Sequence, residues 1–201
     1  ALLKRHETAT HSEVWARADY FLERTTPWGR TSLEPYRLVA KATADRRPAR
    51  THRAIGVEVV GMTACPCAME TIREGNPAYA SLKGVPIITH NQRNRTSLVV
   101  EEPEGFDIEA DDLVAIVESS MSAPTFEVLK RPDEGRLVEE AHARPRFVED
   151  VVREVLGRVL QKYRDLPDHA IVKVKSDSEE SIHKHNAVAQ RVATLGELRA
   201  P

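Results

Sequence analysis

A valine-rich amphipathic pattern between residues 146 and 163 constrains the fold of this chain more than any other feature. Its apolar side chains recur at helical spacing, and Pro145 stands just before it, where proline suits the start of a helix. A helix with such a stripe must bury it against another layer of structure. The residues of the stripe are Val148, Val151, Val152, Val155, Val159 and Leu160.

Apolar segments on both sides of this helix can supply that layer. From residue 55 onward the predicted order is strand, strand, helix, helix, strand, which favours an α+β fold with an antiparallel sheet and helices on one face. Strands are predicted over residues 13–23, 55–60, 95–101 and 170–175, and helices over 33–44, 108–121 and 146–163. Residues 187–198 could form either a helix or a strand.

Composition narrows the classes of protein that this chain can be. With 201 residues and 41% hydrophobic residues, it can bury a core of its own. A net charge of −2 gives no general attraction to nucleic acid or to a membrane surface. No apolar run approaches the ~20 residues that cross a bilayer, and the first residues lack the pattern of a secretion signal. We therefore expect a cytoplasmic protein.

The two cysteines lie together in the tripeptide Cys65-Pro66-Cys67, directly after a predicted buried strand. Two cysteines cannot form a disulfide framework, and the proline restricts Cys65 to an extended backbone. One intervening residue is too few for the usual zinc-finger pair. The tripeptide is thus equally compatible with two small buried side chains and with a reactive or metal-binding site.

Three polar segments could complete such a site. His90, which precedes a predicted strand, is a possible metal ligand, although histidines at strand ends are common. The segment from Lys130 to Glu134 reads most simply as a solvated loop. Glu180 and His183 follow the strand at 170–175 and could converge on a substrate, or form only a polar connector.

Together, Cys65, His90 and one carboxylate would form a mixed sulfur, nitrogen and oxygen ligand set. Three protein ligands leave a coordination position open for water, which is typical of a catalytic site. Cations near these residues could meet a polyphosphate. They are Arg93, Arg95, Lys130, Arg131 and Lys184. No Gly-rich phosphate loop accompanies them, which disfavours P-loop and dinucleotide-binding folds.

Five ordered blocks resemble the GTP cyclohydrolase type IB family, and within it the archaeal MptA-like branch. They are residues 61–68 (Gly-Met-Thr-Ala-Cys-Pro-Cys-Ala), 89–93 (Thr-His-Asn-Gln-Arg), 129–134 (Leu-Lys-Arg-Pro-Asp-Glu), 145–150 (Pro-Arg-Phe-Val-Glu-Asp) and 180–187 (Glu-Ser-Ile-His-Lys-His-Asn-Ala). Residues 1–54 match less distinctly.

The resemblance implies a tunnelling fold (T-fold), in which an antiparallel sheet carries two helices on one face and subunits join their sheets into a barrel. It implies a homodimer or homotetramer and a metal-dependent attack of water on C8 of GTP, with release of formate. In the archaeal branch the metal is Fe(II), with Zn or Mn as possible substitutes, and the product is 7,8-dihydroneopterin 2′,3′-cyclic phosphate for methanopterin-type cofactors. The bacterial branch makes dihydroneopterin triphosphate for folate.

The resemblance also assigns roles to individual residues. Cys65 and His90 match metal ligands, Glu180 matches the group that anchors guanine, and His183 matches a catalytic histidine that moves protons. The third metal ligand is expected to be Glu134, with Glu127 and Glu139 as alternatives. From the resemblance, we expect Cys67 either to lie beside the metal site or to be a redox partner of Cys65. For the substrate phosphates we expect Arg93, Lys130 and Arg131.

A further expectation concerns the division of the chain into modules. Family members carry an earlier N-terminal module with a Gly-x-His-Met-Ser-Arg stretch that this chain lacks. We therefore expect residues 1–54 to be the remainder of that module and residues 55–201 to be a C-terminal module with the metal site.

One alternative function is that of a nitrile reductase on the same fold, in which a cysteine attacks the substrate covalently and NADPH supplies hydride. A non-catalytic scaffold is the other.

Overall fold

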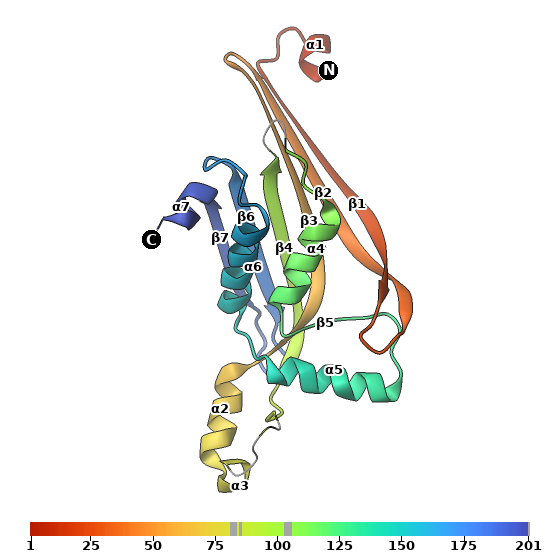
Figure 1. Ribbon diagram of the computed structural model, residues 1–201. Helices are drawn as coiled ribbons and strands as arrows, with labels where there is room; N and C mark the ends of the chain where they lie inside the picture. The colour runs from red at the N-terminus through yellow and green to blue at the C-terminus, as the bar shows by residue number, and fades with distance from the viewer. Residues whose placement is uncertain (81–83, 85, 103–105, 201) are drawn as a thin grey trace.

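A computed structural model describes residues 1–80, 84, 86–102 and 106–200 of the chain. It confirms the α+β class, with a seven-stranded antiparallel sheet in the order β1-β2-β3-β4-β6-β7 and β5 paired to β3 (Figure 1). The elements are α1 (Leu2–Arg5), β1 (His11–Thr25), β2 (Thr31–Arg46), β3 (Ala49–Ala64), α2 (Pro66–Gly75), α3 (Pro77–Ala80), β4 (Asn91–Glu102), α4 (Ala110–Ser120), β5 (Ala123–Pro124), α5 (Arg131–Ala143), α6 (Val148–Lys162), β6 (Ile171–Glu179), β7 (Ala187–Thr194) and α7 (Leu195–Arg199).

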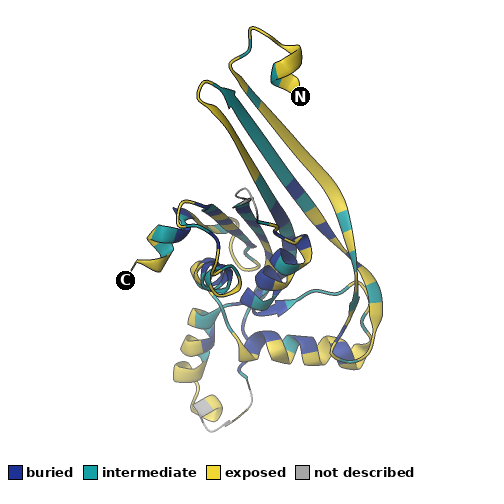
Figure 2. Cartoon of the chain, turned by 45° about the horizontal axis from the view of Figure 1, so that its top comes forward, coloured by how far each residue is buried: buried dark blue, intermediate teal, exposed yellow. Residues whose placement is uncertain are grey.

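Helices α4 and α6 cover one face of the sheet, as the amphipathic patterns predict (Figure 1). The valine stripe of α6 packs with α4 onto β3, β4 and β6, and Val57, Leu98 and Val155 are all fully buried there. Figure 2 shows the buried residues gathered where these two helices meet the sheet. Burial of these apolar side chains is the main force that holds the layers together.

The helix predicted over residues 33–44 is wrong, because this segment forms strand β2. Tyr36 and Leu38 face the helices, while Val39 and Lys41 face the other side, an alternation that only a strand produces. Long antiparallel neighbours pair with β2 on both sides, over Thr31–Asp45 with β1 and over Arg37–Arg46 with β3. These pairings override the helical spacing that the local sequence displays.

Four helices form where the sequence analysis did not place them, the short α1 and α3 and the longer α2 and α5. Helix α2 starts at Pro66, directly after Cys65, and α5 starts at Arg131, so the segment from Lys130 to Glu134 is the first turn of a helix and not a solvated loop. The Asp133 carboxylate accepts a hydrogen bond from the Lys130 backbone N–H at 3.2 Å, which caps α5. Few apolar residues mark α5, so its amphipathic pattern is weak.

The boundary expected between residues 54 and 55 falls inside β3, which pairs with β2 on one side and with β4 on the other. The uncertain segment 187–198 divides into strand β7 and the short helix α7. Across the described residues, no helix is both long and apolar enough to pass through a membrane.

Candidate active site at the ends of strands β3, β4 and β6

The end of β3 and the start of β4 bring the cysteine tripeptide next to His90. Ala64 pairs with Asn91 in the antiparallel ladder, and the backbone N–H of Cys65 donates to the His90 carbonyl oxygen at 3.1 Å. Residues that are 25 positions apart in the sequence therefore become neighbours, because one strand ends where the other begins. This contact places Cys65 and His90 side by side.

Cys65 is the N-cap of helix α2. Its Sγ accepts a hydrogen bond from the backbone N–H of Ala68 at 3.4 Å, and Pro66 occupies the first turn, where its missing N–H costs nothing. This arrangement aims the sulfur at the start of the helix, beside the ends of β3 and β4. Cys65 is half-buried, whereas Cys67, two residues further along the chain, is exposed.

His90, Gln92 and Glu180 form a second, nearly buried group at the same place. His90 Nδ1 lies 3.0 Å from Gln92 Oε1, and Gln92 Nε2 donates to Glu180 Oε1 at 3.3 Å. The His90 and Glu180 side chains are 13% and 12% exposed, and 4.0 Å separates His90 Nδ1 from Glu180 Oε2. The structure thus brings together Cys65, His90 and Glu180, three of the residues that the sequence analysis selected.

His183 lies on the exposed segment that follows Glu180. Its ring stacks on the ring of His185, with centroids 5.3 Å apart and planes 18° apart. Among the described residues, no hydrogen bond or ion pair joins His183 to Glu180. An exposed histidine at this position can still reach a bound molecule and exchange a proton with it.

The three candidate carboxylates for the metal are all exposed. Glu134 and Glu139 are both exposed on α5, and Glu127 is exposed in the segment before that helix. Helix α5 approaches His90 at its last turn, where His142 Nε2 lies 2.9 Å from the carbonyl oxygen of Thr89. Among the described residues, none of the three carboxylates converges with Cys65 and His90.

We tested whether these donors fit a metal ion. Cys65 and His90 provide a thiol and an imidazole on adjacent strand ends, a pairing that suits Fe(II) or Zn(II). Within the described part of the chain, however, no three His, Cys, Asp or Glu side chains converge as a metal-binding group. Two residues of the expected set thus lie on adjacent strand ends, and no carboxylate of the set joins them among the described residues.

The expected phosphate-binding cations lie at two places. Arg93 lines a hollow of about 360 Å³ together with Arg95, Phe126 and Glu127, on the sheet face opposite to α4 and α6. Lys130 and Arg131 are exposed at the start of α5, a few residues beyond this hollow. The fifth cation named from the sequence, Lys184, is exposed on the segment after Glu180, and of the five only Arg93 and Arg95 line this hollow.

Two residues next to the site were not selected from the sequence as site residues. Gln92 is 8% exposed and contacts both His90 and Glu180, and His142 is 1% exposed and holds the backbone before His90. Gln92 stands within the block at residues 89–93, two positions after His90. Because residues two apart on a strand share one face, the sequence could have indicated that the Gln92 side chain lies beside His90. No local signal marks His142.

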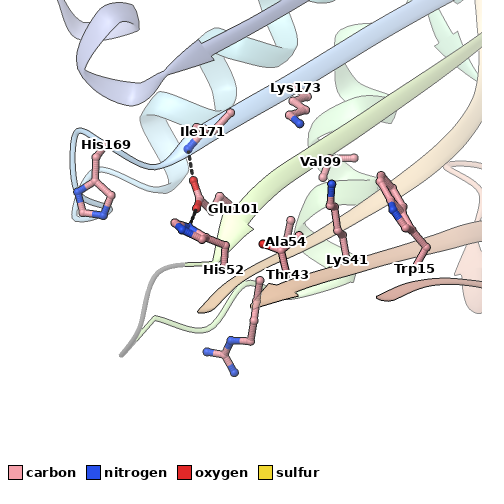
Figure 3. A pocket seen from close by; sticks show the side chains of 11 residues that line it. Trp15, Lys41, Thr43, His52, Ala54, Val99, Glu101, His169, Ile171 and Lys173 are labelled. Atoms are coloured by element: carbon pink, nitrogen blue, oxygen red, sulfur yellow. Dashed lines mark hydrogen bonds and ion pairs between the residues drawn. The ribbon is translucent and has the colours of Figure 1, made fainter. Parts of the chain in front are cut away.

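A separate hollow of about 430 Å³ lies on the open face of the sheet (Figure 3). Glu101 joins two of its walls, because Oε1 lies 2.7 Å from His52 Nδ1 and Oε2 accepts from the Ile171 backbone N–H at 3.1 Å. This hollow is near the end of β4, about 30 Å along the strand from Asn91 at ~3.3 Å per residue. Among the described residues that line it, none belongs to the predicted site.

Comparisons with known proteins agree with the resemblance seen in the motifs. The model of a family described as type I GTP cyclohydrolase folE2 matches residues 1–189. The chain is 44% identical to GTP cyclohydrolase MptA 2 of Methanocella arvoryzae over 214 residues, which cover 98% of this chain and 69% of that relative. It is 43% identical to GTP cyclohydrolase MptA of Methanothermobacter thermautotrophicus, covering 98% of this chain and 67% of the relative. The MptA of Methanosarcina mazei is 42% identical, with 98% and 68% covered.

Proposed function

The chain belongs to the type I GTP cyclohydrolase folE2 family, and on that premise we propose that it opens the imidazole ring of GTP at C8 and releases formate. The family and its MptA-named relatives make it a GTP cyclohydrolase of methanopterin-type pterin biosynthesis. The proposed product is 7,8-dihydroneopterin 2′,3′-cyclic phosphate, with dihydroneopterin triphosphate as the alternative. One observation carries the proposal: Cys65, His90 and Glu180 meet at adjacent strand ends.

The proposed metal site consists of Cys65, His90 and one carboxylate, with Fe(II) as the ion and Zn or Mn as possible replacements. A thiolate, an imidazole and a carboxylate suit all of these ions. When bound, the ion would lower the pKa of a water molecule toward neutrality and so supply a nucleophile. Glu134, which matches the family block, is the proposed third ligand, with Glu127 and Glu139 as the alternatives.

Glu180 is proposed to hold the guanine base and His183 to move the proton. An ionised carboxylate accepts hydrogen bonds, and the N1–H and exocyclic amine of guanine are donors on one edge of the base. Guanine C8 is a poor electrophile until its ring nitrogen is protonated, so an acid must stand near the attacking water. His183 is exposed on the segment just after Glu180, where it can deliver that proton.

Arg93, Lys130 and Arg131 are proposed to bind the triphosphate. Guanidinium groups bind phosphate oxygens through paired N–H donors, and Lys130 adds a point charge. Arg93 lies in the hollow beside Arg95, on the strand that begins next to His90. A substrate whose base lies at Glu180 could therefore extend its phosphates along β4.

We further propose a T-fold whose subunits join into a homodimer or homotetramer through the edges of their sheets. Strands β1 and β7 are the two edges of the sheet, and each is long enough to pair with another strand. On β7, Val188 and Val192 are 51% and 58% exposed and lie beside the unpaired backbone edge that a lone subunit would leave open to water. Association that continues the sheet across subunits would cover it.

The proposal is tested by anaerobic incubation of the protein with GTP and Fe(II), measuring formate and the mass of the pterin product. Cys65→Ala should lose both metal binding and turnover, because it removes a ligand, while the matched control Cys67→Ala should keep both. Glu134→Gln should lose more metal affinity than either Glu127→Gln or Glu139→Gln. Full turnover by Cys65→Ala would refute the assignment, and NADPH oxidation without metal would point to the nitrile reductase.

A further inference from the structure

Gln92 occupies the space between His90 and Glu180. Its side chain is 8% exposed, with Oε1 3.0 Å from His90 Nδ1 and Nε2 3.3 Å from Glu180 Oε1. The closest direct approach of His90 Nδ1 to Glu180 is 4.0 Å, which is too long for a hydrogen bond. The hydrogen-bonded link between Glu180 and His90 therefore passes through this amide.

The chemistry of the three groups allows only one hydrogen-bonding order. An ionised Glu180 can only accept, so the amide of Gln92 must turn its N–H donors toward it. The amide oxygen then faces His90 Nδ1, and because that oxygen can only accept, Nδ1 must carry a proton. In a neutral imidazole the lone pair is consequently on Nε2.

Further contacts hold His90 on the same side. The hydroxyl of Ser181 lies 3.5 Å from Nδ1, so both side-chain contacts of the ring involve the same nitrogen. The His90 carbonyl oxygen accepts from the Cys65 N–H, and the residue before it, Thr89, is held by His142. The ring and its backbone are thus restrained together, and Nε2 has no hydrogen bond to any described residue.

We propose that Gln92 is a positioning residue that relays the charge of Glu180 to His90, holding the imidazole in its Nδ1–H tautomer and leaving Nε2 to bind the metal ion. This inference rests on the proposed metal-binding role of His90. It also links the two halves of the site, since the carboxylate that would hold guanine then orients the ligand that would hold the metal.

The tautomer can be measured in the metal-free protein, labelled with ¹⁵N-histidine and assigned with a His90→Gln variant. Wild-type His90 should show a protonated Nδ1 and an unprotonated Nε2. Gln92→Leu keeps the bulk of the side chain but removes both hydrogen bonds, so the tautomers should mix. Affinity for Zn²⁺ or Co²⁺, titrated alone, should fall about 10–100-fold, as for other partners of metal-ligating histidines.

An exchange of the two side chains separates this relay from a merely structural role. Gln92→Glu combined with Glu180→Gln places a carboxylate against His90 and an amide beyond it, so the hydrogen-bonding order is retained. The exchanged protein should recover the Nδ1–H tautomer and metal affinity to within about threefold of wild type, while turnover stays low because the group facing guanine has changed. Gln92→Glu alone sets two carboxylates together and should not recover.

Three results would overturn the inference: a wild-type His90 protonated at Nε2, a Gln92→Leu protein with unchanged tautomer and metal affinity, or an exchanged protein that recovers neither. Failure of the proposed function would look different. In that case the wild type would have the Nδ1–H tautomer and bind the metal, yet release no formate from GTP.

Discussion

Replacing His142 with phenylalanine should destabilise the protein by removing the hydrogen bond that anchors the segment before His90. His142 is 1% exposed on the last turn of α5, with Nε2 2.9 Å from the carbonyl oxygen of Thr89 and Nδ1 2.7 Å from that of Val138. The Val138 carbonyl lies one turn earlier in the same helix and has the backbone N–H of His142 as a second donor. Both ring nitrogens face carbonyl acceptors and a neutral imidazole has one N–H, so the loss falls on Thr89 when Nε2 carries that proton.

The size of the effect follows from burial. Phenylalanine fills nearly the same volume, so the packing changes little, but the Thr89 carbonyl is left without the imidazole donor in a buried place. An acceptor orphaned in this way costs about 1–3 kcal/mol. With a urea dependence of about 1–3 kcal/mol per molar for domains of this kind, the unfolding midpoint should fall by roughly 1 M.

The assay is urea unfolding followed by circular dichroism, with all proteins at one concentration so that any self-association contributes equally. Thr89→Val is the matched control on the same segment. The Thr89 hydroxyl is buried and has no hydrogen-bond partner among the described residues, so a methyl group of the same shape should leave stability equal or higher. A His142→Phe midpoint equal to wild type, or an equal loss in Thr89→Val, would refute the reasoning.

Two other pairs of variants test the core. Burial raises the pKa of the Tyr36 and Tyr163 hydroxyls far above their usual range, with a hydrogen bond to Glu118 adding to the shift at Tyr36. Because the pKa of each hydroxyl is higher in the folded protein, its contribution to stability is complete below pH about 10 and declines above it. The stability of Tyr36→Phe should therefore fall less steeply with rising pH than that of the wild type. At pH 7, Tyr36→Phe should lower the free energy of unfolding by about 1.5–3 kcal/mol. Tyr163→Phe should leave it unchanged, because the Tyr163 hydroxyl has no hydrogen-bond partner within the described residues. Equal losses in the two variants would contradict this reasoning. Gly61→Ala should cost about 1–3 kcal/mol, because the new Cβ would lie 2.1 Å from a buried methionine sulfur. Gly135→Ala, with open space around it in α5, should stabilise by up to ~1 kcal/mol, and thermal unfolding that ranks the two glycine variants in the opposite order would contradict the packing argument.

Local patterns were enough to predict the elements whose burial is periodic. The stripe from Val148 to Leu160 predicted α6, and the apolar runs around Val57, Leu98 and Val174 predicted strands that the structure confirms. These elements face the core with a single face, so their spacing is visible in the sequence itself. Helix α5 has no such regular stripe, and its first turn was therefore mistaken for a loop.

The sequence by itself also determined which residue types could act, since Cys65, His90 and Glu180 stand at predicted strand ends. Only the tertiary structure decided which of these groups meet. The pairing of Ala64 with Asn91 brings Cys65 to His90, and Gln92 comes between His90 and Glu180 because β4 and β6 pair there. The same long-range pairing turned residues 31–46 into a strand against their helical spacing. Strand register joins residues that are tens to a hundred positions apart, and such contacts depend on partners that no local pattern contains.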